Sequence, residues 1–368
     1  MNILSKNKIW LIPAVLIGIV LLLLVSAGSN KHSIRKAVSE ELDQLENLDE
    51  DNTEDYLRAS DLFPSDESLT PDPQITKLFS TYFKNFSYKT GKILTEGDTA
   101  TVPVTIQNID AHELARDYTM AALEKKIACE ANPSQVEFSL KDSYLLLADT
   151  LENNHYKKVK TSFNIYLENR NGEWKMIHDD SLDNHLTGNF LTYMADSNLL
   201  TPEEVVTIHF NTIKDFDSEQ LNIYLALNSL FSNEDTYGNS IAYALADQIR
   251  KFFDYKIIKT DSSDRTATVQ VEITSTDFKN IMKDYQERLS NWVGTSSSMS
   301  GGAQGRRDKE LEFLLKSIEE NDCSSTNIVE IELLNDGTNW KMQMTNAVIQ
   351  SIIGDVDTSL SEFSKKRR

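Results

Sequence analysis

TATVPVTIQNID at residues 99–110 and TATVQVEITSTD at residues 266–277 decide the fold, because seven of these twelve positions are identical at an offset of 167. Both stretches alternate apolar and polar side chains, which is the pattern of a β-strand with one buried face. The same offset pairs Tyr88 with Tyr255 and Phe86 with Phe253. Self-similarity over this span predicts two tandem copies of one domain.

A second pair of landmarks sets the length of the repeat. Residues 174–176 and 340–342 both read WKM, at an offset of 166. A unit of about 165 residues is too long for a solenoid repeat and has the size of an ordinary domain. The TPEE sequence from Thr201 indicates a helix start with Pro in the first turn, which places the boundary near Leu200. We therefore predict a membrane or signal segment at 1–30, domains at 33–199 and 200–360, and a basic tail at 361–368.

Each copy has the same expected order of elements: helices, a strand hairpin, a helix pair, a second hairpin and a closing helix. The helices before the first hairpin are predicted at 33–48, 53–62 and 74–83, and at 202–216, 218–227 and 237–252. The strands are predicted at 86–95, 99–109, 157–168 and 173–178, and at 255–260, 266–274, 326–334 and 339–344. Asp110 and Asp277 stand where the next helices need an N-cap.

These landmarks resemble those of cell-envelope proteins of Gram-positive bacteria that carry tandem domains of unknown function. Each copy also resembles the cone-shaped α+β fold of nuclear transport factor and ketosteroid isomerase. The resemblance implies helices packed on a curved antiparallel sheet, and a cystatin-like sheet with one packed helix is the alternative. The chain departs from the simplest cone by its long helix pair between the hairpins. The fold also hosts isomerases, dehydratases and binding modules, so it does not specify an activity.

The N-terminal segment is the strongest local signal. Ile9 to Ala27 is an uncharged run of 19 residues, IWLIPAVLIGIVLLLLVSA, long enough to cross a hydrocarbon core of about 30 Å. The small residues ending at Ala27 also fit a signal-peptidase site, so a cleaved signal peptide is the alternative to an uncleaved anchor. We expect a single-pass protein of the cell membrane with the bulk of the chain outside the cytoplasm. The bilayer is then the first partner.

Composition excludes several classes of function. With 37 basic and 57 acidic residues the formal net charge is -20, which argues against nucleic acid as a partner. Only Cys129 and Cys323 occur, so the sequence contains neither a disulfide framework nor a zinc-ligand spacing. No metal or cofactor is predicted.

One segment concentrates groups that could perform chemistry. Residues 178–185, HDDSLDNH, hold two imidazoles and three carboxylates, and His178, Asp183 and His185 are the candidate catalytic residues. The simpler interpretation is a helix start, with Asp180 or Ser181 as N-cap and Asp183 in the first turn. The second copy has Met344, Thr345 and Asn346 at the equivalent places, so a site here belongs to the first domain.

Aromatic residues on the strands supply the other candidates. Tyr88, Trp174, Tyr255 and Trp340 either fill the core of each sheet or line a pocket for a small apolar ligand. The sequence favours an extracytoplasmic binding or interaction module of the cell envelope, whose partner is an envelope protein or such a ligand. A small-pocket enzyme of the ketosteroid-isomerase-like type and the ectodomain of a membrane sensor complex are the alternatives.

Overall fold

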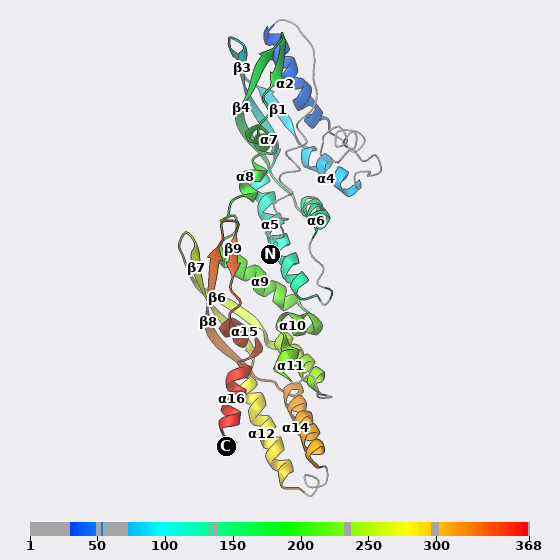
Figure 1. Cartoon of the computed structure of the whole chain (residues 1–368), viewed down its shortest axis with the longest axis vertical. Helices are drawn as coiled ribbons and strands as arrows, with labels where there is room; N and C mark the ends of the chain where they lie inside the picture. Colours follow the sequence, from blue (N-terminus) through cyan, green and yellow to red (C-terminus); the bar gives the residue numbers. More distant parts are fainter. Residues whose placement is uncertain are drawn as a thin grey trace. The chain divides into compact units, whose positions relative to one another are not determined.

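The computed structural model describes residues 30–48, 53, 73–132, 134, 139–231, 237–295 and 302–366. The chain divides into two compact units, and each is described by itself (Figure 1). Unit 1 comprises Met1–Ala122 and Phe138–Leu199, and unit 2 comprises Leu123–Glu137 and Leu200–Arg368.

Unit 1 combines helices with one antiparallel sheet of order β1-β3-β4-β5, in which β2 also pairs with β3. The strands are β1 (Ser87–Thr90), β2 (Leu94–Glu96), β3 (Thr99–Ile109), β4 (Lys158–Arg170) and β5 (Glu173–Met176). The helices are α2 (Asn30–Glu46), α4 (Pro73–Phe83), α5 (Ala111–Glu130), α6 (Leu140–Asn153), α7 (Asp180–Leu186) and α8 (Phe190–Met194). Helix α5 belongs to unit 1 as far as Ala122.

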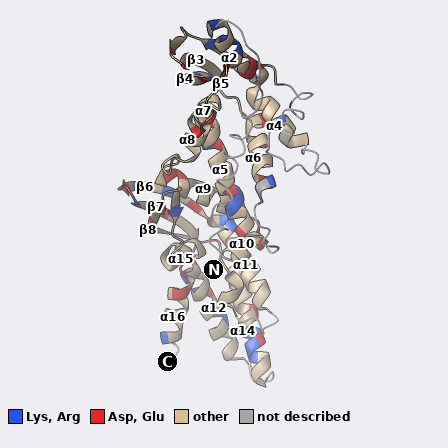
Figure 2. Cartoon of the chain, turned by 45° about the horizontal axis from the view of Figure 1, so that its top comes forward, with Lys and Arg blue, Asp and Glu red and all other residues tan. Residues whose placement is uncertain are grey.

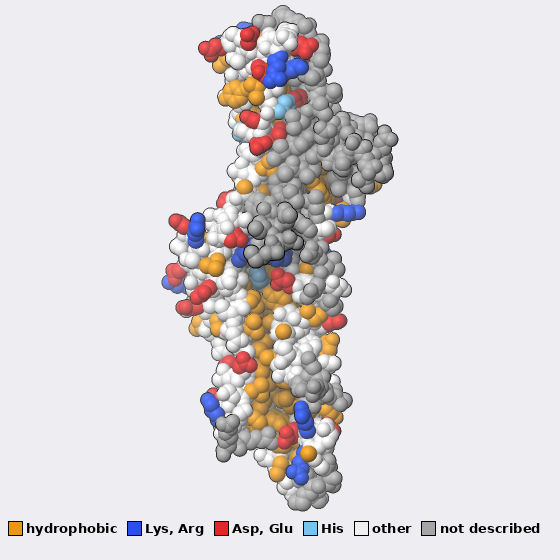
Figure 3. Space-filling view, in the orientation of Figure 1, with side chains coloured by type: hydrophobic (Ala, Val, Ile, Leu, Met, Phe, Trp, Pro, Cys, Tyr) orange, Lys and Arg blue, Asp and Glu red, His pale blue; other side chains and the backbone are white. Residues whose placement is uncertain are grey.

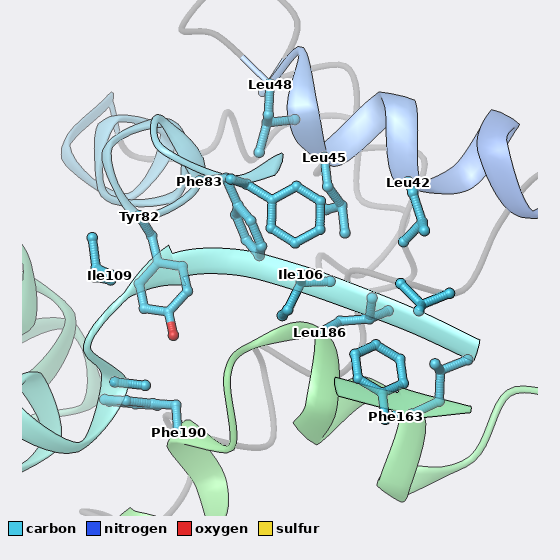
Figure 4. Close-up of a cluster of buried hydrophobic side chains, with 14 of the residues drawn as sticks. Leu42, Leu45, Leu48, Tyr82, Phe83, Ile106, Ile109, Phe163, Leu186 and Phe190 are labelled. Atoms are coloured by element: carbon cyan, nitrogen blue, oxygen red, sulfur yellow. The ribbon is translucent and has the colours of Figure 1, made fainter. Parts of the chain in front are cut away.

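The alternating sequence of β3 determines which face of the unit 1 sheet is buried. Val102, Val104 and Ile106 are at most 2% exposed, whereas the residues between them are half-buried. Helices α2 and α4 cover this inner face, and Leu45, Phe83 and Ile106 meet in the core (Figure 4). The alternation therefore becomes an amphipathic sheet with a helical cover.

The first hairpin strand of unit 1 is interrupted, contrary to the prediction of one strand at 86–95. Strand β1 ends at Thr90, opposite Val104, and β2 begins at Leu94, opposite Thr101. Between them the Gly91 N–H donates to the Pro103 carbonyl over 2.6 Å. Pro103 has no N–H to donate in return, so the ladder breaks at this point.

Unit 2 repeats the strand order as β6-β7-β8-β9. Its strands are β6 (Asp254–Ser262), β7 (Thr266–Thr276), β8 (Ser324–Asn335) and β9 (Trp340–Met342). Its helices are α9 (Pro202–Asp215), α10 (Ser218–Tyr224), η4 (Leu227–Leu230), α11 (Gly238–Phe252), α12 (Phe278–Val293), α14 (Gly302–Glu319), α15 (Asn346–Ile353) and α16 (Val356–Lys366). Gln270 stands where unit 1 has Pro103, and β6 continues past it with one irregularity between Ile257 and Lys259.

The predicted α+β class with curled antiparallel sheets is confirmed. The predicted N-caps are also present: Asp110 accepts from the Glu113 N–H, and Asp277 accepts from the Asn280 N–H. Strands β5 and β9 end two residues earlier than predicted, which leaves His178 in a loop. Helix α16 continues to Lys366, so the first part of the predicted basic tail is helical.

The predicted membrane segment, Ile9 to Ala27, lies outside the described residues, as does nearly all of the helix predicted at 53–62. Within the described ranges, no helix combines the length and the hydrophobicity needed to cross a bilayer. Both cysteines are free thiols and half-buried.

Candidate functional site

Three ionisable side chains from three elements of unit 1 form a polar cluster, which we call the Glu41 triad. Helix α2, which packs along β5, supplies Glu41. The loop after β5 supplies His178, and the first turn of α7 supplies Asp183. The His178 Nε2 lies 3.4 Å from the Glu41 Oε2, and Asp183 is only 3% exposed.

The surroundings of the triad favour bound protons. The Glu41 carboxylate raises the pKa of His178 by accepting its hydrogen bond, and burial opposes this effect. Burial raises the pKa of Asp183 to about 6, although the neighbouring imidazole acts in the opposite direction. The pKa of Asp183 therefore lies closer to neutral pH than that of an ordinary carboxyl group, and His178 keeps its proton to a higher pH than an ordinary imidazole does.

Each member of the Glu41 triad has one buried polar atom with no hydrogen-bond partner among the described residues: Glu41 Oε1, His178 Nδ1 and Asp183 Oδ1. Buried polar atoms are normally paired, so three in one cluster indicate room for a bound water or a small polar group. Metal binding has no comparable support, since no group of three His, Cys, Asp or Glu in the described ranges could hold an ion.

His185, the third predicted catalytic residue, is not a member of the Glu41 triad. His185 stacks on Phe163 of β4, with ring centroids 4.9 Å apart.

The prediction of Asp180 or Ser181 as N-cap of α7 is wrong, because the Leu182 N–H donates to Asp179 over 2.8 Å. Asp179 lies just before the helix with an extended backbone, the conformation that an N-cap requires. Asp183 does lie in the first turn, as predicted.

The four aromatic candidates lie in or beside the two cores. Trp174 and Trp340 are 7% and 5% exposed, on β5 and β9 respectively. The Tyr88 hydroxyl donates to Asp43 Oδ1 over 2.6 Å. The Tyr255 hydroxyl donates to Asn211 Oδ1 over 2.8 Å. Burial, reinforced by Asp43, raises the pKa of Tyr88, so this tyrosine remains a donor at neutral pH. Their role as a ligand pocket stays a prediction.

The two tyrosine contacts identify the unit 2 counterparts of the Glu41 triad. Since Asp43 and Asn211 hold equivalent tyrosines, α2 and α9 correspond at an offset of 168, which places His209 opposite Glu41. The WKM register places Met344 opposite His178 and Ile349 opposite Asp183. Unit 2 therefore keeps the frame and lacks the three-residue polar cluster.

His209 itself is satisfied within its own helix. Its Nδ1 lies 3.0 Å from the Val205 carbonyl oxygen. Burial lowers the pKa of His209, which favours the neutral imidazole. The unit 2 position is thus a half-buried histidine that is hydrogen-bonded within its own helix.

Glu41 was not predicted as a site residue, although its position in the sequence marks it as unusual. Ile34, Val38, Leu42 and Leu45 form the buried stripe of α2, and Glu41 lies on it, three residues after Val38 and four before Leu45. An ionisable residue on an apolar helical stripe predicts a buried polar contact.

Asn108 is a second missed residue. It is 2% exposed on the inner face of β3, and neither of its amide atoms has a hydrogen-bond partner in the described part of the chain. Its unit 2 counterpart, Ser275, donates to the Ile352 carbonyl.

Comparison with known proteins gives little further help. No family model matches the chain, and no curated protein matches it. One solved structure is similar, the crystal structure of a putative lipoprotein, YcdA, from Bacillus subtilis subsp. subtilis str. 168. It is 10% identical over 73% of this chain and 95% of that chain, with a TM-score of 0.28, which does not establish a shared fold.

Proposed function

We propose that this chain is a membrane-anchored binding or interaction module of the cell envelope, with its two units outside the cytoplasm. The observation that carries the proposal is the uncharged 19-residue segment from Ile9 to Ala27. Thirteen of its residues are Leu, Ile or Val, each favouring insertion by about 0.3–0.6 kcal/mol. Helix α2 begins only three residues after this segment, so unit 1 is the part tethered closest to the bilayer.

The two units are, in this proposal, tandem copies of one cone-like domain with different roles. The shared strand order and the equivalent tyrosine contacts support a common origin. The Glu41 triad supports binding of a small polar ligand in unit 1, because unit 2 conserves the frame without the triad. Unit 2 would then act as a structural partner or a protein-binding element.

The anchor and the site are tested separately on the full chain. Deletion of residues 2–27 should release the protein from the membrane fraction, and retention without them would contradict the anchor. For the site, full-length protein extracted from its host is weighed by native mass spectrometry. A retained small molecule should disappear in Glu41→Gln and persist in the unit 2 control His209→Gln. Equal loss in both variants would refute a unit 1 site.

A small-pocket enzyme of the ketosteroid-isomerase-like type is the second candidate. It is favoured by Asp183, whose pKa of about 6 suits a general acid or base near neutral pH. In that case His178 and Asp183 would exchange the substrate proton, with Glu41 as a positioning residue. Turnover that persists in both His178→Gln and Asp183→Asn would eliminate this candidate.

A further inference from the structure

An exposed apolar row crosses the outer face of the unit 1 sheet. Leu94 of β2 pairs with Thr101 of β3, and Thr101 pairs with Tyr166 of β4. The Ile177 N–H, just after β5, donates to the Tyr166 carbonyl over 2.8 Å and extends the row. Leu94, Tyr166 and Ile177 are 58%, 53% and 42% exposed, respectively.

The row faces away from the helical cover. Its neighbours along the strands, Ala100, Val102, Ile165 and Leu167, are at most 3% exposed and belong to the core on the opposite face. In the space-filling view, hydrophobic side chains gather at the surface over β3 and β4 (Figure 3). The core does not need these apolar side chains, so their presence at the surface calls for another explanation.

Unit 2 has a polar row at the equivalent place. Thr268 pairs with Asp261 on one side and Glu332 on the other, and the Gln343 N–H donates to the Glu332 carbonyl over 2.9 Å. The threonine is common to both rows, whereas the three apolar residues of unit 1 are replaced by Asp, Glu and Gln. The apolar row at this register is therefore specific to unit 1, whereas the unit 2 sheet exposes Ile258, Ile328 and Leu334 at other strand positions.

The outer faces of the two sheets also differ in the charges that they carry. The outward strand positions of unit 1 carry five basic residues, Lys89, Lys158, Lys160, Arg170 and Lys175, against three acidic ones, Glu96, Glu168 and Glu173. Those of unit 2 carry three basic residues, Lys256, Lys259 and Lys341, against five acidic ones, Asp254, Asp261, Glu272, Glu330 and Glu332. The face with the apolar row is thus the more basic one in a chain of net charge -20. Figure 2 colours the basic and acidic residues along the chain.

The course of α2 relates this face to the N-terminal segment. Leu48 lies over the Ile109 end of β3, and Leu42 lies further toward its start (Figure 4). The helix begins at Asn30, roughly 18 Å before Leu42 along its axis, at the end of unit 1 where β2 and β3 form their hairpin. The three residues from Ala27 to Asn30 reach at most about 10 Å, so an inserted segment holds this end of unit 1 at the bilayer.

We propose that unit 1 docks on the outer surface of the membrane through Leu94, Tyr166 and Ile177. Tyrosine is favoured at the level of lipid head groups, and exposed Leu and Ile side chains enter the boundary of the acyl region. The lysines of the same face attract anionic lipid, while the short tether raises the effective concentration of this surface at the bilayer. The inference rests on the membrane anchor of the proposed function.

The test uses the full chain in vesicles of equal parts phosphatidylglycerol and phosphatidylcholine. Amide exchange at 94–101 and 164–177 is compared between the wild type and the triple variant Leu94→Asp, Tyr166→Glu, Ile177→Gln, which introduces the unit 2 residues. Docking should make exchange in these segments about tenfold slower in the wild type than in the variant. The unit 2 row, at 261–268 and 332–343, should exchange equally in both proteins and serves as the internal control.

Three outcomes would overturn the inference, and each has a different meaning. Equal exchange in a wild type and variant that both stay with the vesicles refutes docking and leaves the anchor intact. Loss of the wild type from the vesicles refutes the anchor and docking together. Protection that falls when the wild type is diluted at constant lipid assigns the row to a second copy of the chain instead. Unchanged exchange of β3 residues 104–109 in the variant verifies that unit 1 still folds.

Discussion

The two units share a frame and differ in how well their buried polar groups are satisfied. Twelve buried side-chain nitrogen and oxygen atoms have no hydrogen-bond partner within the described part of the chain, and eight of them belong to unit 1. They include the three atoms of the Glu41 triad and both amide atoms of Asn108. Stability alone would select against such groups, so their concentration in one copy supports the unit 1 site that we propose.

The largest expected effect lies at a glycine that both units share. Gly354 has φ +83°, and an added Cβ would lie 2.2 Å from the Thr276 carbonyl oxygen. Gly188, its counterpart, has φ +65°, and its Cβ would meet the Ala111 Cβ at 3.4 Å, an ordinary contact. We predict that Gly354→Ala destabilises unit 2 by more than about 4 kcal/mol, because a backbone clash adds to the left-handed strain.

Gly188→Ala is the matched control, with an expected loss of about 1–2 kcal/mol from the left-handed strain alone. Native-state amide exchange of β3 and β7 measures each unit separately, since a chain of two units does not guarantee two-state unfolding. A similar loss in the two variants would show that the close approach at Gly354 is relieved by a small shift of Thr276.

A smaller effect on the stability of unit 1 is expected from removing the charge of Asp183. In the folded chain the pKa of Asp183 is about 6, against 3.8 for the unperturbed group, so folding favours the protonated form. That contribution is complete below pH 3.8 and is lost as pH rises through 6, which destabilises unit 1 by roughly 2–3 kcal/mol at neutral pH. Asp183→Asn should therefore stabilise unit 1 by about 2 kcal/mol at pH 7 and flatten its stability between pH 4 and 7.

Amide exchange of β3 at pH 5 and pH 7, corrected for the intrinsic rates, measures this difference. Asp180→Asn, an exposed change in the same helical turn, is the control and should leave most of the pH dependence in place, because the Asp180 charge raises the pKa of Asp183 less than burial does. An unaltered pH dependence in Asp183→Asn would mean that another group carries it.

Asn108 and Ser275 offer a comparison within the equivalent strands. We predict that Asn108→Leu stabilises unit 1 by about 1–2 kcal/mol, because it removes two unpaired buried polar atoms at similar volume. Ser275→Ala should destabilise unit 2 by about 1 kcal/mol, because it removes the hydrogen bond to Ile352. Thermal unfolding, monitored by amide exchange in β3 for unit 1 and in β7 for unit 2, measures both changes in stability. A destabilising Asn108→Leu would indicate that a bound water or ligand pairs with the amide.

Local periodicity was enough to predict most elements of each unit. The alternation in β3 and β7 and the Asp caps act within a few residues, so they are visible in the sequence. The break between β1 and β2 was not predicted, because it depends on Pro103 in the neighbouring strand. Glu41 was missed for a similar reason: its partners follow in sequence by more than 130 residues, and only its position on the apolar stripe of α2 marks it.

The smallest expected effect concerns the tyrosine hydrogen bond that each unit makes at the equivalent position. Tyr88 donates to a carboxylate, whereas Tyr255 donates to a neutral amide, and hydrogen bonds to charged groups are the stronger. Tyr88→Phe should therefore destabilise unit 1 by about 1.5 kcal/mol, and Tyr255→Phe should destabilise unit 2 by about 1 kcal/mol. Adding Asp43→Asn to Tyr88→Phe completes a double-mutant cycle, with exchange in β3 as the measurement. A coupling near zero would show that solvent screens the Asp43 contact, and the difference between the units would then reside in their buried polar groups alone.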